Sequence, residues 1–158
     1  MKNILILIVL FYVYSCNSNS SAEQYWNNAK KSRVEENSKE AISNYKKIIE
    51  YYPNNDLAAK SQFQIADIYL NDIKDYDYSI DEFEKVISKY KDHDVAKKSL
   101  FMIGYIYNNY LDAYTDAINK YELFLNTYPN DELAPSVIYE LEGLEKNKNT
   151  INELIKNK

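Results

Sequence analysis

Few residues of this sequence have side chains that could perform chemistry, and they are widely separated along the chain. The single cysteine, Cys16, offers a thiol that can attack an electrophile or accept an acyl group. The single histidine, His93, has an aspartate on each side and could act as a base or as a pH sensor. Paired carboxylates could act as general acid and general base, and the candidate pairs are Asp75 with Asp77 and Glu82 with Glu84.

The positions of these residues favour structural interpretations over catalytic ones. His93 falls in a polar stretch between two helical patterns, where a solvated turn residue is expected. The paired acids lie on amphipathic helical patterns, where acidic residues usually form a solvated face. One cysteine cannot form an intrachain disulfide, and one histidine cannot form a His-rich metal site. We therefore predict that the protein is not an enzyme and has no catalytic residues, metal or cofactor.

The composition favours helices joined by short turns. The chain has 158 residues, enough for one well-cored domain, and contains only 2 glycines and 3 prolines. Barrels, sandwiches and Gly-rich nucleotide loops need more residues with positive φ at their corners. The net charge of −5 argues against nucleic acid as a partner, because phosphate binding needs a basic face.

The start of the chain, 1–21, is typical of a targeting segment. A basic start is followed by an unbroken apolar run, 4–13, which is too short for a membrane span of about 20 residues. The next residues complete the stretch Val13-Tyr14-Ser15-Cys16, which resembles the lipobox of bacterial lipoproteins. The resemblance implies that 1–15 is a signal peptide, that Cys16 is lipidated and that 16–21 is a polar tether. The alternative is an ordinary signal peptide followed by an incidental cysteine.

A pattern with a constant period runs through the rest of the chain. Small and aromatic residues recur at equal steps, as Ala41, Ser79 and Ala117, and as Tyr45, Phe83 and Tyr121. The apolar positions within each unit recur at three and four, which is helical spacing. Asn37 and Thr150 each begin a capping-box pattern, and Asp56, Asp94 and Asp131 stand where N-caps are expected. We predict helices at 22–34, 38–52, 56–72, 78–90, 94–110, 114–127, 131–145 and 150–157.

The units resemble tetratricopeptide repeats. The second helix of each unit carries a small-x3-aromatic pattern, and the first carries Ile65-Ala66-x2-Tyr69 or Ile103-Gly104-x2-Tyr107. Gly104 stands where close packing of two helices leaves no room for a Cβ. The resemblance implies an all-α solenoid of helical hairpins forming a right-handed superhelix, with seven to eight helices. Three units would occupy 22–145, and a capping helix 146–158.

The resemblance also points to a binding groove. In tetratricopeptide proteins the first helices line the concave face, where this sequence repeats an aromatic residue as Trp26, Phe63, Phe101 and Tyr139. We expect this aromatic row to bind a helix or an extended segment of a partner protein. The flanking residues on the same helical faces are Lys30, Lys60, Asp67, Lys98 and Tyr105. The alternative is that the rings are half-buried between adjacent first helices and touch no partner.

The long 38-residue form of the repeat, together with the lipobox, is similar to repeats of bacterial envelope proteins. It resembles BamD-like outer-membrane assembly lipoproteins and YbgF-like coordinators of envelope constriction and peptidoglycan synthesis. The resemblance implies a lipid-anchored scaffold for protein–protein interactions on the periplasmic face of the outer membrane. Two alternatives remain open: a lipoprotein whose helices frame a closed ligand pocket, and a structural subunit that associates with itself.

Overall fold

The structure, a computed structural model, describes residues 20–156, with side chains through residue 146. This part of the chain contains seven α-helices, one π-helical turn and no strand, which confirms the predicted all-α fold. The predicted signal peptide, Cys16 and most of the predicted tether lie outside the described residues. The elements are α2 (Ala22–Val34), α3 (Ser38–Tyr51), α4 (Asp56–Ile68), η1 (Tyr69–Ile73), α5 (Tyr76–Lys89), α6 (Asp94–Asn109), α7 (Tyr114–Thr127) and α8 (Ala134–Lys156).

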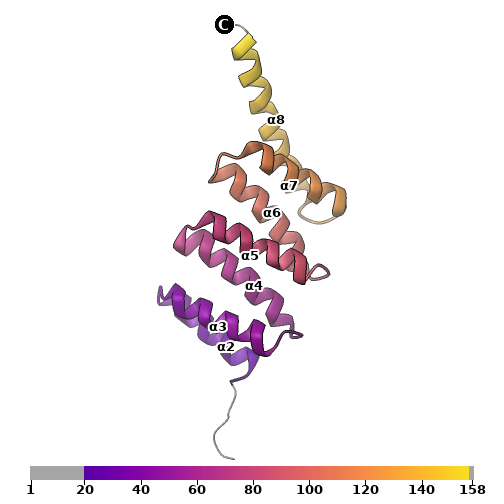
Figure 1. Cartoon of the computed structure of the whole chain (residues 1–158). Coiled ribbons are helices and arrows are strands. Elements are labelled where there is room, and N and C mark those ends of the chain that lie inside the picture. Colours follow the sequence, from indigo (N-terminus) through magenta and orange to yellow (C-terminus); the bar gives the residue numbers. More distant parts are fainter. Residues whose placement is uncertain (1–19, 157–158) are drawn as a thin grey trace, which may run out of the picture.

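The helices form three antiparallel hairpins that stack in chain order, followed by α8 (Figure 1). The hairpins are α2 with α3, α4 with α5, and α6 with α7, and α8 packs on α7. Tyr45, Phe83 and Tyr121 fill the centres of the three hairpins and are almost completely buried. Burying each of these side chains contributes about 1.5–3 kcal/mol of hydrophobic stabilisation. The helical-hairpin repeat predicted from the sequence is therefore present.

Gly104 allows a close helix contact in the third hairpin. A Cβ at this position would lie 2.5 Å from the Tyr121 ring, which is closer than unbonded atoms can approach. The prediction that a Cβ here would hold α6 and α7 apart is confirmed.

The turns within the hairpins use left-handed backbone without glycine. Glu36, Lys74 and Asp112 have φ of 58°, 63° and 52°, and they recur at the same spacing as the repeat. A non-glycine residue in this conformation costs about 1–2 kcal/mol. The scarcity of glycine therefore does not mean that the fold lacks sharp turns, because three non-glycine residues adopt the left-handed conformation.

Several predicted helix ends differ by one or more residues. The N-caps of α4 and α6 are Asn55 and His93, not Asp56 and Asp94, because the side chains of the former accept hydrogen bonds from the backbone two residues on. Asn37 caps α3 as predicted, although Glu40 does not complete a capping box. Ser21, predicted to end the tether, forms a capping box at the start of α2.

The chain after residue 145 does not start a new helix. Instead, α8 runs without a break from Ala134 to Lys156 and extends past the stack (Figure 1). No glycine or proline stands between Gly143 and the end of α8, so nothing forces the helix to stop before the predicted cap at Thr150. None of the helices in residues 20–156 is long and apolar enough to cross a membrane.

Candidate functional site

The predicted aromatic row lies along the first helices of the hairpins, α2, α4 and α6, and on α8. Three of its rings contact the central aromatic residue of their own hairpin. The ring centroids are 5.2 Å apart for Trp26 and Tyr45, 5.2 Å for Phe63 and Phe83, and 6.0 Å for Phe101 and Tyr121. These three rings are half-buried, so each is part core and part surface.

Tyr139 differs from the other three members of the row. Its side chain is 77% exposed, and in the described structure no second helix follows α8 to cover it. Its neighbour Ile138 is 44% exposed, whereas the equivalent residue one repeat earlier, Leu100, is buried. The last part of the row therefore offers the most accessible apolar surface.

The charged flanks are partly paired within the protein. Lys60 forms an ion pair with Asp56 at 2.5 Å on the same helix, while Lys30 and Lys98 are exposed. Tyr105 is half-buried beside Tyr110, with ring centroids 6.0 Å apart. The predicted flanking residues thus do not form one continuous cluster.

Asp67 belongs to a closed ionic cluster that we call the first junction. Arg33 of α2 reaches across to α4 and η1, where Nη2 lies 2.6 Å from Asp67, Nε lies 2.9 Å from Asp72 and Nη1 donates to Gln64 at 3.1 Å. Burial lowers the pKa of Arg33, but the hydrogen bonds to Asp72 and Asp67 outweigh burial and raise this pKa. The guanidinium therefore stays charged. It pairs with Asp67, which the sequence suggested as a contact for a partner protein.

A second cluster, the last junction, lies between α6 and α8. Asn108 of α6 donates to Glu140 of α8 at 3.0 Å. Glu140 and Asn108 line a cavity of about 380 Å³, to which Tyr139 and Gly143 also contribute. No charged residue recurs at this position of the repeat, so the sequence did not predict Asn108 and Glu140 as site residues.

Tyr121 lies near Glu140 and Asn108, but it is not among the residues that line this cavity. The residue is fully buried, and its hydroxyl has no hydrogen-bond partner among the described residues. Burial raises the pKa of Tyr121, and the charge of the nearby Glu140 adds to this rise. The Asn108 amide opposes the rise, but its Nδ2 donates to Glu140 rather than satisfying the hydroxyl.

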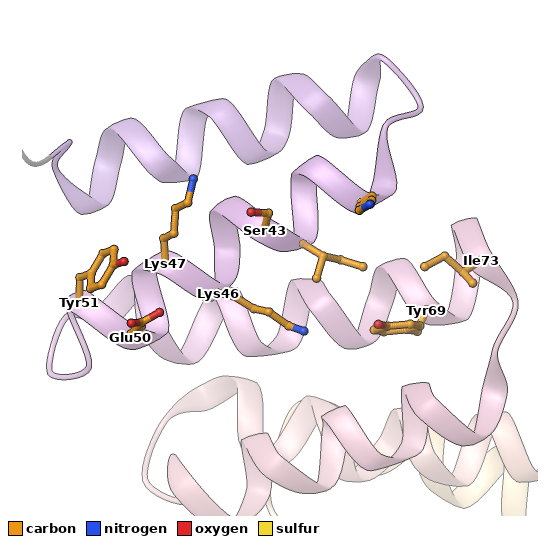
Figure 2. A pocket seen from close by; sticks show the side chains of 9 residues that line it. Ser43, Lys46, Lys47, Glu50, Tyr51, Tyr69 and Ile73 are labelled. Carbon is orange, nitrogen blue, oxygen red and sulfur yellow. The ribbon is translucent and has the colours of Figure 1, made fainter.

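A larger hollow, of about 570 Å³, lies on the other helix of the first hairpin. Figure 2 shows Lys46 and Lys47 of α3 beside this hollow, with Tyr69 and Ile73 of η1 at its far end. The three lysines of the hollow, at positions 39, 46 and 47, have the spacing of one helical face, and this signal could have been found in the sequence.

His93, at the start of α6, contacts Asp56 of α4 and so links the second and third hairpins. Neither interpretation from the sequence, a solvated turn residue or a base and pH sensor, included this link. Its Nδ1 accepts from the Val95 backbone N–H at 3.2 Å, and its Nε2 lies 3.0 Å from Asp56 Oδ1. Hydrogen bonds from Lys60 and His93 lower the pKa of Asp56. His93 is thus a helix cap that also contacts Asp56 through Nε2, rather than a solvated turn residue.

Comparison with known families agrees with this helical architecture. The family model described as soluble NSF attachment protein (SNAP) matches residues 11–136, which is most of the chain. The chain belongs to the SNAP family. A comparison with curated proteins finds no match.

Membership of the SNAP family supports a role in protein–protein interaction, because this is a family of helical scaffolds. It therefore argues for protein binding over catalysis. Within the described residues, no group of three or more His, Cys, Asp or Glu is arranged to hold a metal ion. The family match ends at residue 136, so Glu140 and the α8 side of the last junction lie beyond it.

Proposed function

We propose that this SNAP-family chain is a lipid-anchored scaffold of a bacterial cell envelope that binds a segment of an envelope protein along its aromatic row. We assign it to outer-membrane protein assembly, as in BamD-like lipoproteins. The observation that carries the proposal is the row itself, in which Trp26, Phe63 and Phe101 remain half-exposed at equivalent positions of successive hairpins. Aromatic side chains at regular intervals suit the periodic contacts of a bound helix or extended segment.

The lipid anchor is part of the same proposal, and its support comes from the sequence and from the start of α2. Two acyl chains hold a protein stably on a membrane, and the lipobox at Cys16 provides for them. The Tyr52 hydroxyl donates to the carbonyl of Ser20 at 2.8 Å and ties the chain to the first hairpin. Only the stretch 17–20 reaches from there back to Cys16, a span of about 14 Å at most. The first hairpin would then stand close to the membrane.

Site-specific photocrosslinking in cells tests the binding face. A photoreactive phenylalanine analogue is placed at Phe63 or Phe101 in the full-length chain, and the captured proteins are identified. Leu123 is the control position, because it is 49% exposed but lies on α7, the second helix of the third hairpin, which does not carry the aromatic row. We expect capture of outer-membrane assembly components from Phe63 and Phe101 and not from Leu123.

Other outcomes of this experiment overturn parts of the proposal. Capture of cell-division proteins would replace the assembly role with a YbgF-like role. Crosslinks only to other copies of the chain would point to self-association. Equal capture from Leu123 would mean that the aromatic row is not the binding face.

The anchor is tested separately with Cys16→Ser. We expect this variant to lose its attached lipid and to leave the membrane fraction. A Cys16→Ser variant that stays in the membrane fraction with unchanged mass would show that the segment 1–15 acts in another way.

A further inference from the structure

One face of α3 carries three lysines that we call the basic face: Lys39, Lys46 and Lys47. All three line the hollow of about 570 Å³ (Figure 2). None of them forms an ion pair with a carboxylate among the described residues, although Lys47 Nζ lies 5.4 Å from the centroid of the Tyr25 ring. Glu50 is the only acidic residue among those that line the hollow. The basic face therefore has positive charge that the protein itself does not neutralise.

The basic face belongs to the first hairpin alone. The equivalents of Lys39 and Lys46 in α5 and α7 carry no positive charge: Asp77 and Thr115 for Lys39, and Glu84 and Glu122 for Lys46. Lys39 and Lys46 are exposed, so packing does not require lysine at either position. The segment 21–52 has one more basic than acidic residue, whereas 53–158 has seven more acidic than basic residues. The first hairpin is thus the part of the repeat region that suits an anionic surface.

The basic face also lies near the point where the predicted tether joins the fold. Tyr52, directly after α3, donates to the Ser20 carbonyl at 2.8 Å. Along the helix, Lys47 is about 8 Å from this point and Lys39 about 20 Å, at a rise of about 1.5 Å per residue. A lipid on Cys16 would place the other end of the tether at a bilayer surface. All three lysines would then be within reach of that surface.

We propose that the basic face docks on the anionic phospholipid surface of the membrane that holds the lipid anchor. This inference rests on the proposed function, because the lipid on Cys16 brings α3 to the membrane. The lysine ammonium groups would donate to lipid phosphates. Tyr51, at the end of α3, is 57% exposed and lines the same hollow, and a ring with a polar tip suits the membrane interface. Ile73, which is 44% exposed across the hollow, would add an apolar contact.

The charges are sufficient to orient the anchored protein. Each lysine near an anionic membrane surface favours the docked state by about fivefold. Glu50 offsets one of the three lysines, and the remaining two charges favour docking by about 25-fold. The aromatic row lies on α2, α4, α6 and α8 rather than on α3, so a partner protein could bind while α3 contacts lipid.

Footprinting of lysine amines tests the docking. The full-length gene is expressed in cells, and the protein is purified from the membrane and inserted into the outer leaflet of preformed vesicles. One set of vesicles is phosphatidylcholine, and the other contains phosphatidylglycerol as well. A short pulse of an acetylating reagent, followed by mass spectrometry, gives the reaction rate at each lysine.

The expected result is protection of the basic face that depends on lipid charge. Lys39, Lys46 and Lys47 should react about tenfold more slowly on the anionic vesicles than on the neutral ones. Lys98, which is exposed on α6, should react at the same rate on both. High salt should remove the difference, because it screens exposed charges.

Two double variants identify the charges that dock. Lys39→Glu with Lys46→Glu should abolish the slower reaction of Lys47 on anionic vesicles. Lys89→Glu with Lys91→Glu makes the same change of charge at exposed positions in and just after α5, and should preserve it. Circular dichroism checks that both variants keep the helical fold.

Equal rates at the basic face on the two kinds of vesicle would overturn the inference, and so would equal slowing of Lys98. The same result from both double variants would also overturn it. If the rates are equal and a photocrosslinker at position 46 captures an envelope protein in cells, the face binds an acidic protein and not lipid.

The mass of the intact chain separates this inference from the proposed function. A lipidated chain whose basic face is not protected would keep the anchor and reject the docking. A chain without lipid whose basic face is protected only on anionic vesicles would keep the docking and reject the anchor.

Discussion

The first and last junctions occupy equivalent places in the solenoid but differ in how their polar groups are satisfied. At the first junction, Arg33 holds Asp67 and Asp72 at 2.6 and 2.9 Å, and all three side chains are about one-quarter exposed. At the last junction, Glu140 accepts from a neutral amide and the nearby Tyr121 hydroxyl has no partner among the described residues. The first junction joins its helices through an ion-pair cluster, and the second joins them through a neutral hydrogen bond and leaves one buried hydroxyl without a partner among the described residues.

The difference shows that one position of the repeat decides whether a junction is joined by an ion pair or by a neutral hydrogen bond. Arginine at position 33 uses its donors inside the protein, so the carboxylates around it are not available to a partner. The equivalent residue of α6 is Asn108, because it follows Phe101 by seven positions as Arg33 follows Trp26, and its neutral amide donates to Glu140. Three substitutions, taken from the largest expected effect to the smallest, test this contrast.

Gly104→Ala tests the packing beneath the last junction and should have the largest effect. The new Cβ would meet the buried Tyr121 ring at 2.5 and 2.8 Å, so the ring must move. Overpacking costs about 1–3 kcal/mol, and the upper end applies here because the ring that must move is fully buried. The better helix propensity of alanine returns up to about 1 kcal/mol. We expect a net loss of about 2 kcal/mol, measured by urea unfolding of the full-length chain in micelles.

Gly143→Ala is the matched control for this substitution. It makes the same change in α8, where nothing lies within 4 Å of the new Cβ. It should stabilise the protein by up to about 1 kcal/mol through helix propensity alone. If both substitutions stabilise the protein, the contact between Gly104 and Tyr121 is not the constraint that sets glycine at this position.

Arg33→Met tests whether the first junction is a structural clamp. Removing the guanidinium leaves Asp67 and Asp72 near each other without a cation. Both side chains are about one-quarter exposed, which is between the exposure of surface ion pairs and that of buried ones. We expect a loss of about 1.5 kcal/mol in the free energy of unfolding, between the values for exposed and buried pairs, and a smaller loss at high salt.

Lys31→Met removes one positive charge from the same helix and provides the control. Its ion pair with Glu35 is long, at 3.8 Å, and both side chains are more than half exposed. The change should stay within about 0.5 kcal/mol. Equal losses from Lys31→Met and Arg33→Met would show that net charge, rather than the junction, determines stability.

The repeat spacing predicted the hairpins and their central residues because burial imposes the same small and aromatic residues in each unit. Tyr45, Phe83 and Tyr121 were found in this way, and so was the close contact of Gly104. The left-handed turns could not be predicted from composition, because Glu36, Lys74 and Asp112 adopt positive φ without glycine. Their common spacing is visible only once the backbone is known.

The candidate site was less predictable than the fold. The sequence placed the aromatic row on one face, but it could not show that Trp26, Phe63 and Phe101 share their rings with the core. Nor could it show that Asp67 is already paired with Arg33, since the two residues are far apart in the sequence. The two junctions differ because of residues that do not recur in the repeat, such as Arg33 and Glu140. A search for repeated residues does not find them.

Asn108→Arg should have the smallest effect on stability and gives the sharpest test of the contrast. It places at the last junction the residue that stands at the equivalent position of α2, where it would face Glu140 as Arg33 faces Gln64. The guanidinium would replace a neutral hydrogen bond to Glu140 with a partly exposed ion pair. This ion pair should stabilise the protein by about 0.5 kcal/mol, measured by urea unfolding of the full-length chain in micelles.

A double-mutant cycle separates the ion pair with Glu140 from a general change at position 108. If Asn108→Arg acts through Glu140, its stabilising effect should disappear in the Glu140→Gln background, because coupled residues are not additive. Asn108→Gln, which changes size without charge, should not stabilise the protein. A stabilising effect of Asn108→Arg that survives Glu140→Gln would mean that the two junctions are not interchangeable.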